Sequence, residues 1–163
     1  PDARLVIAGE AMAPMHPLES LIGTLRIEAS VDLRLGYVPR AEVQYFFCAA
    51  DAVVLPHVQI STSGVVPLAY RYARPVIATT AGALSEIVKD GETGFLVPPG
   101  AEQPLAEAIC RAFRDPERLA AMGAHARDWF ETERNWDEIA RRTATLYGSL
   151  VAGSSGSGKR RRA

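Results

Sequence analysis

The segment STSGVVPLAYRYARPVIATTAGALSEIVKDGETGFLVPPG occupies residues 61–100 and alternates helix-forming stretches with short apolar runs. Residues 75–78 are such a run, and Gly and Pro lie around it, which is typical of a strand buried in a parallel sheet. A helix is predicted for residues 64–73, and another is predicted around Glu86. Strands and helices that alternate in this way predict an α/β domain.

The same alternation extends towards both ends of the chain. Before the segment, the pattern predicts strands at residues 4–9, 31–35 and 52–56 and helices at 17–28 and 40–50. After it, three helices are predicted at residues 102–113, 116–130 and 136–150, with Pro116 in the first turn of the second and Asn135 as the cap of the third. The predicted fold class is therefore α/β, a Rossmann-like doubly wound parallel sheet with C-terminal helices.

The domain is expected to cover residues 1–150, and residues 151–163 are expected to form a flexible Gly/Ser tail with a basic end. The run at residues 4–9 reads as a strand buried on both faces. Because the sequence starts with Pro1, one step before that strand, we expect an N-terminally truncated domain.

Composition excludes several functional classes. The 163 residues have a formal net charge of −1, and since four basic side chains lie in the last five residues, the preceding residues carry −5. A mildly acidic body without a basic stripe argues against nucleic-acid binding. No apolar run is long enough to predict a membrane-spanning helix. We expect any peripheral membrane association only for a full-length protein that contains this chain, and not for the chain alone.

The cysteine and histidine pattern predicts no metal site. Cys48 and Cys110 each lie in an apolar helical pattern, so we expect buried, reduced thiols and a cytoplasmic location. His16 and His125 are expected at the surface, and His57 follows a predicted strand, where a ligand contact and a surface position are both open. Core positions are predicted for Trp129, Phe130, Trp136, Ile139 and Leu146.

The loop Ser61-Thr62-Ser63-Gly64 is the first candidate for binding chemistry. It follows a predicted strand and opens a predicted helix, so its backbone N–H groups and hydroxyls can face an anion at the sheet edge. Gly64 would let a phosphate approach the backbone closely. The competing interpretation is an ordinary Ser or Thr helix cap.

Two further loops follow the first. Residues 79–84 join a buried strand to the helix with Glu86, and Gly82 in that loop is either a turn residue or part of the same binding edge. Glu86 is expected to orient the loop by capping the helix. Residues 90–97 are predicted to be a tight turn that leads into a strand, a structural role.

Taken in order, four segments resemble the retaining glycosyltransferases of the GT-B fold, often called glycosyl transferases group 1. They are GYVPRAEVQYFFCAADAVVLP at 36–56, SGVVPLAYRYARPVIAT at 63–79, GALSEIVKDGETGFLVPPG at 82–100 and WDEIARRTATLY at 136–147. The resemblance runs from about Leu5 to Leu150. It favours the anion-site interpretation of the Ser61–Gly64 loop over the simple cap.

The resemblance implies an enzyme that transfers a sugar from a nucleotide diphosphate sugar to an acceptor, with retention, and needs no other cofactor. This chain would be the donor-binding half, and the acceptor domain would lie upstream, so we expect little or no turnover from the chain alone. The residues it implies for the donor are Thr62, Ser63, Gly64 and Val65 at the diphosphate, Gly36, Tyr37 and Val38 beside the base, Leu68 or Ala69 at the ribose, and Gly82.

The chain departs from the family where two glutamates usually flank the donor loop. Ile60 and Leu68 occupy those positions, and neither supplies a carboxylate. A non-catalytic GT-B-like module that binds a nucleotide sugar or a partner therefore stays open as an alternative. A dinucleotide-binding Rossmann domain is disfavoured, because no Gly-rich fingerprint follows the first predicted strand.

Overall fold

The computed structural model describes residues 3–133 and 136–155. It divides into two compact units, Pro1–Ala49 and Ala50–Ala163, and each is described by itself. Both units are built from parallel strands and flanking helices in a Rossmann-like arrangement, as the sequence predicts.

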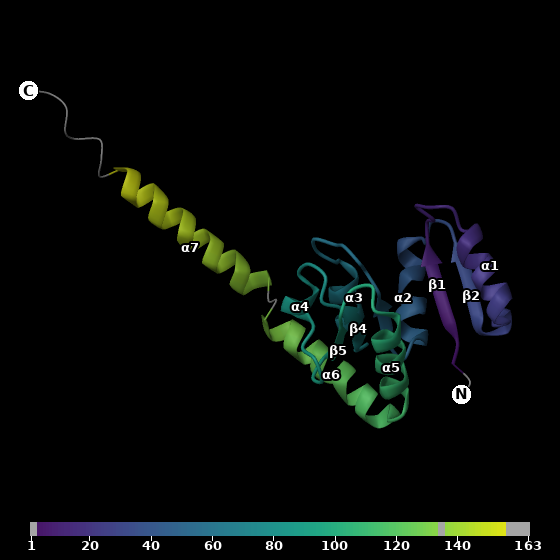
Figure 1. Ribbon diagram of the computed structural model, residues 1–163. Coiled ribbons are helices and arrows are strands. Elements are labelled where there is room, and N and C mark those ends of the chain that lie inside the picture. The colour runs from purple at the N-terminus through teal and green to yellow at the C-terminus, as the bar shows by residue number, and fades with distance from the viewer. Residues whose placement is uncertain (1–2, 134–135, 156–163) are drawn as a thin grey trace, which may run out of the picture. The chain divides into compact units, whose positions relative to one another are not determined.

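The first unit contains a two-stranded parallel sheet. Strands β1 (Leu5–Gly9) and β2 (Val31–Leu35) pair in register from Leu5 beside Val31 to Gly9 beside Leu35 (Figure 1). Helix α1 (His16–Leu25) and a 3-10 turn, η1 (Glu28–Ser30), connect them, and α2 (Arg40–Ala49) follows β2. Both strands and α2 lie close to the predicted positions.

Two expectations for this unit are wrong. Strand β1 is not buried on both faces, because it pairs with β2 in a sheet of two strands and the side chains of Leu5 and Val6 remain 47% and 46% exposed. Helix α1 ends at Leu25 and does not reach residue 28. Arg26 adopts a left-handed conformation with φ 55°, and its N–H closes the helix on Gly23 and Ile22.

The second unit is organised around the central strand of a three-stranded parallel sheet. The order is β3 (Val53–Leu55), β4 (Val76–Thr79) and β5 (Gly94–Val97), and all four residues of β4 are buried. Helix α3 (Val65–Arg71) connects β3 to β4, and the short helix α4 (Leu84–Ile87) connects β4 to β5. The first three residues of β4 are apolar, as a strand covered on both faces requires, and its last residue is Thr79.

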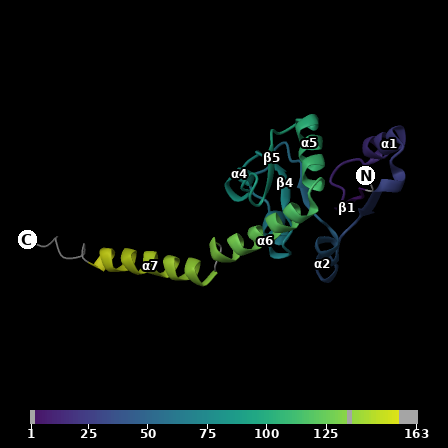
Figure 2. The ribbon, with the colours of Figure 1, turned by 90° about the horizontal axis from the view of Figure 1, so that it is seen from below.

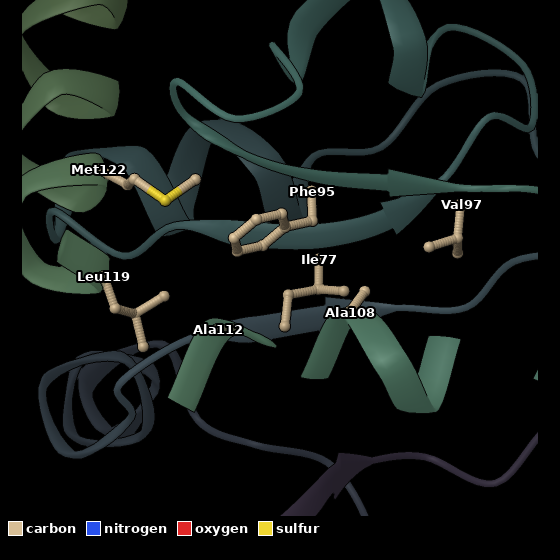
Figure 3. Packing of buried hydrophobic residues seen from close by; sticks show 7 residues of the cluster. All are labelled: Ile77, Phe95, Val97, Ala108, Ala112, Leu119 and Met122. Atoms are coloured by element: carbon tan, nitrogen blue, oxygen red, sulfur yellow. The ribbon is translucent and has the colours of Figure 1, made fainter. Parts of the chain in front are cut away.

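One face of this sheet packs against α5 (Glu102–Phe113) and α6 (Pro116–Glu133). Figure 3 shows the resulting cluster, in which Ile77 of β4 and two β5 residues meet small or flexible side chains of the helices. Its buried members are Ile77, Phe95, Val97, Ala108, Ala112, Leu119 and Met122.

The C-terminal helices follow the predicted pattern with a few differences. Asp115 caps α6 by accepting the N–H of Arg118 at 2.9 Å, and Pro116 occupies the first helical position. Figure 2 shows α6 next to α5 and β4. Helix α7 (Trp136–Ser155) continues five residues past its expected end, into the segment expected to be a flexible tail. Asn135, the side chain of Trp136 and residues 156–163 lie outside the described residues.

The expected core residues of these helices divide into two groups. Trp129 and Phe130 are half-buried and their rings meet Tyr70 edge-on, which confirms that part of the prediction. Ile139 and Leu146 are exposed, so their predicted core positions are wrong. Among the described residues, no helix combines the length and apolar character that a bilayer crossing needs.

Both cysteines are exposed, which contradicts the expectation of buried thiols. The reason is clearest in α5, where Ala108 and Ala112 lie on the buried side, four residues apart. Cys110 falls halfway between them and therefore points the other way. Apolar composition located the helix, but only the helix phase decides which face a residue occupies.

Helices α3 and α6 approach each other closely at Gly123. A Cβ atom on Gly123 would overlap the backbone carbonyl of Ala73, which follows α3 and is held at φ 53°. By contrast, a Cβ on Gly148 in α7 would meet no atom within 4 Å. Packing therefore requires a glycine at Gly123 but not at Gly148.

We predict that Gly123→Ala lowers the free energy of unfolding by about 1–2 kcal/mol, because overpacking outweighs the usual helical gain from alanine. Urea denaturation followed by circular dichroism measures it. Gly148→Ala is the matched control and should not lower stability. Equal changes in the free energy of unfolding for the two variants would contradict the close packing of α3 on α6.

Candidate functional site

In the second unit, the loops that follow β3 and β4 lie at the same edge of the sheet. The strands are parallel and adjacent, so their carboxyl ends coincide. The first loop covers residues 56–64, and the second covers residues 80–83. Ligands of open α/β sheets bind at this edge, and most of the sequence-predicted site residues of the second unit are found here.

A buried threonine fixes the start of the first loop. Thr79, the last residue of β4, is 2% exposed, and its Oγ1 donates to the carbonyl oxygen of His57 at 2.5 Å. The hydroxyl thereby joins the end of β4 to a backbone carbonyl of the first loop. Sequence reasoning missed this role, although a polar residue at the end of the fully apolar run 75–78 was a signal for it.

The second loop fixes the end of the first. The N–H of Ala83 donates to the carbonyl oxygen of Ser61 at 3.1 Å. Gly82 has φ 54°, and a Cβ atom there would overlap the carbonyl of Ile60 and crowd that of Ser61. Gly82 is therefore required by backbone packing. It supports the first loop whether or not it touches a ligand.

Between these two fixed points, the predicted anion loop is exposed at most of its positions. Thr62, Gly64 and Val65 are exposed, whereas Ser63 is buried at 9% exposure. The Oγ of Ser63 accepts the N–H of Val65 at 3.2 Å, a local contact at the start of α3, but the residue in the cap position is Gly64 and no side chain caps the helix there. The hydroxyl proton of Ser63 is not used in its bond with Val65.

Gly64 is open on the side where a side chain would lie. Its φ is −74°, a value that any residue adopts, and a Cβ atom there would meet nothing within 4 Å. The fold of the free chain therefore does not require glycine at this position. Space next to an exposed backbone is what a close-approaching ligand needs.

The stretch of chain that contains the two loops lacks acidic side chains. The sequence contains no Asp or Glu between Ala52 and Ser85, so no carboxylate of this stretch repels an anion or can act as a general base. Leu68 is half-buried on α3. His57 is half-buried and contributes its backbone carbonyl to the Thr79 contact.

The remaining predicted residues lie in the first unit, after β2. The N–H of Gly36 donates to the carbonyl of Gly9 at 2.9 Å, which joins the ends of the two parallel strands. Tyr37 is 74% exposed and Val38 is half-buried. These three residues form a group of their own within that unit.

Glu86 does not cap helix α4, contrary to expectation. The helix begins after Ala83 without a side-chain cap, and the side chain of Glu86 is exposed in its first turn. Glu10, His16 and His125 are exposed. In the described part of the chain, no three His, Cys, Asp or Glu side chains gather as a metal site would require.

Comparison with known proteins identifies the family. A sequence profile described as "Glycosyl transferases group 1" matches residues 1–115. The alpha-maltose-1-phosphate synthase of Mycolicibacterium smegmatis is 30% identical over 93% of this chain and 42% of its own length. The D-inositol 3-phosphate glycosyltransferase of Corynebacterium glutamicum is 30% identical over 97% of this chain and 38% of its own length.

Solved structures agree with the sequence relatives. Anabaena Alr3699/HepE in complex with UDP superposes with a TM-score of 0.81 at 26% identity, over 91% of this chain and 42% of that one. Sucrose-phosphate synthase from Thermosynechococcus elongatus gives a TM-score of 0.77 at 28% identity, over 91% and 38%. The chain thus spans 38–42% of the length of these four proteins.

The contrast between Gly82 and Gly64 is testable. We predict that Gly82→Ala lowers the free energy of unfolding by about 2–5 kcal/mol, because the left-handed backbone and the overlap with Ile60 both oppose a side chain. Gly64→Ala should cost less than about 1 kcal/mol. Urea unfolding followed by tryptophan fluorescence compares them, and a cost at Gly64 as large as at Gly82 would contradict the described loop packing.

Proposed function

The chain belongs to the glycosyl transferases group 1 family, and from this membership we propose that it is the donor-binding half of an enzyme that transfers a sugar from a nucleotide diphosphate sugar to an acceptor, with retention at the anomeric carbon. The observation that carries the proposal is the geometry of the loop Ser61–Gly64. A Cβ atom on Gly64 would meet nothing within 4 Å, and the loop is supported by the hydrogen bond of Thr79 to His57 and by the close backbone contact of Gly82. The related HepE structures in complex with UDP and with UDP-glucose support it.

The donor diphosphate is assigned to the backbone and hydroxyls of Thr62, Ser63, Gly64 and Val65, with Gly82 behind them. Thr62 is exposed and can turn its hydroxyl towards an oxyanion, and the unused proton of Ser63 Oγ is a second donor. Leu68 is assigned to the ribose, where it offers an apolar contact in place of a hydrogen-bond acceptor. For the first unit, Gly36, Tyr37 and Val38 are assigned to the base.

Catalysis in such a site depends on charge stabilisation and positioning. When the bond between the sugar and the diphosphate breaks, negative charge grows on the leaving phosphate oxygen. Donors fixed in advance, here on a loop tied to β4 and the following loop, stabilise that charge without reorganising. Positioning the acceptor hydroxyl is assigned to a domain outside these 163 residues, since the relatives are more than twice as long.

The second candidate function is a GT-B-like module that binds a nucleotide sugar or a partner without catalysis. The absence of Asp and Glu between Ala52 and Ser85 favours it, because no carboxylate in that stretch can act as a general acid or base. Turnover by a longer chain with an acceptor domain would exclude it, and donor binding without turnover would support it.

We predict that one of UDP, GDP and ADP raises the melting temperature of the 163-residue chain. A ligand at about 100 times its dissociation constant stabilises a folded protein by roughly 2.7 kcal/mol. Gly64→Val should abolish the rise, because its side chain occupies the open space beside the loop, while the melting temperature without nucleotide changes little.

Two outcomes would count against the proposal. A folded wild-type chain whose melting temperature responds to none of the three nucleotides would overturn donor binding by this chain. An equal response in wild type and Gly64→Val would place the nucleotide elsewhere. Gly148→Val, in α7 where a Cβ atom would meet nothing within 4 Å, is the control for non-specific effects of an added Val.

A further inference from the structure

Helix α3 carries a buried tyrosine whose hydroxyl the proposed function does not use. Tyr70 and Thr93 are both fully buried, and their hydroxyl oxygens lie 2.7 Å apart. Burial raises the pKa of Tyr70 to about 12, against a smaller opposing effect of the Thr93 bond, so the hydroxyl stays protonated at neutral pH and the hydrogen bond is intact there.

Thr93 is tied to the turn that leads into β5. Its Oγ1 accepts the N–H of Lys89 at 2.9 Å, and its own N–H donates to the Lys89 carbonyl at 2.9 Å. The N–H of Val76 in β4 donates to the carbonyl of Thr93 at 3.3 Å. Thr93 therefore links α3, through Tyr70, to the 89–93 turn and the central strand.

The ring of Tyr70 packs against α6. It meets Trp129 edge-on at 6.2 Å and Phe130 at 6.5 Å between ring centroids. A phenylalanine would make these same ring contacts. The hydroxyl adds a directional hydrogen bond that fixes the position of the side chain. A buried tyrosine hydroxyl needs a partner at a defined distance and angle, whereas apolar packing tolerates small shifts of a helix.

Helix α3 transmits this constraint to the loop in front of it. The helix has seven residues, so it is only about 10 Å long and consists of about two turns joined by backbone hydrogen bonds. Tyr70 lies near its end, and the loop Ser61–Gly64 precedes its start. A shift of the helix at Tyr70 therefore displaces Val65 and the exposed backbone of Gly64.

We propose that the Tyr70–Thr93 hydroxyl pair is a positioning contact that fixes α3, and with it the Ser61–Gly64 loop, in the conformation that receives the donor diphosphate. This inference rests on the proposed function for its ligand, but the positioning of α3 can be measured without one. Tyr70 and Thr93 act through the helix and do not touch the donor.

The test compares four variants of the 163-residue chain by hydrogen exchange. Tyr70→Phe and Thr93→Val remove the hydroxyl pair, and Thr93→Ser keeps a hydroxyl. Ile77→Val, in the cluster on the α5 side of the sheet, is the matched control for a general loss of stability. Loss of one hydrogen bond should speed exchange in residues 61–72 by about tenfold in the first two variants.

Thr93→Ser should return exchange in residues 61–72 to within about twofold of wild type, and Ile77→Val should not accelerate this segment more than α5. The proposal is overturned if Tyr70→Phe accelerates exchange no more in residues 61–72 than in α5. It is also overturned if Thr93→Ser behaves like Thr93→Val.

The second measurement is the dissociation constant of whichever of UDP, GDP and ADP binds the wild type, by calorimetry. It should rise about tenfold in Tyr70→Phe and Thr93→Val and stay within about twofold in Thr93→Ser and Ile77→Val. The positioning role is overturned if Tyr70→Phe and Thr93→Val accelerate exchange selectively in residues 61–72 but leave the dissociation constant of the nucleotide unchanged. Failure of the wild type to bind any nucleotide overturns the proposed function instead, and exchange alone then decides whether the pair fixes α3.

Discussion

The second unit depends on the complete burial of β4. A strand with every side chain buried must be paired on both edges and covered on both faces, and β4 lies between β3 and β5 accordingly. Its last residue, Thr79, connects this buried strand to the site. A buried hydroxyl needs a hydrogen-bond partner, and Thr79 donates to the carbonyl of His57 in the loop after β3. The core thus sets the position of the loop that follows β3.

The loop itself combines two kinds of glycine. Gly82 is needed by the fold, since its backbone touches that of Ile60, whereas Gly64 leaves space that the fold does not use. The Tyr70–Thr93 pair adds a third support at the far end of α3. Exposed donors on a loop supported from the core are suited to holding an anion whose charge increases during a reaction. This physical role agrees with membership of a glycosyltransferase family.

Much of the fold could be predicted from the sequence, because short apolar runs bounded by Gly and Pro mark strands whatever their surroundings. Helix α5 and strand β2 have the predicted bounds, and α2 differs from the prediction by one residue. The predictions that were wrong concerned features that a local sequence pattern does not determine. The exposure of Cys110 follows from helix phase, the exposure of Leu5 from the number of paired strands, and the early end of α1 from the backbone of Arg26.

The candidate site was only partly predictable for the same reason. The sequence indicated the Ser61–Gly64 loop and Gly82, which are local signals, but not the contacts of Thr79 and of Tyr70 with Thr93, which join residues 22 and 23 positions apart. The separate roles of Gly64 and Gly82 likewise appear only when each missing side chain is placed among its neighbours.

The central claim is that the Ser61–Gly64 loop and the start of α3 bind the diphosphate of the donor. The most direct measurement is the change in backbone amide NMR signals of the isotope-labelled chain on addition of UDP, GDP or ADP, compared with the corresponding nucleoside. We expect the amides of residues 62–65 and Gly82 to shift with the nucleoside diphosphate that binds and not with its nucleoside. Shifts that leave these residues unchanged, or that the nucleoside alone reproduces there, would contradict it.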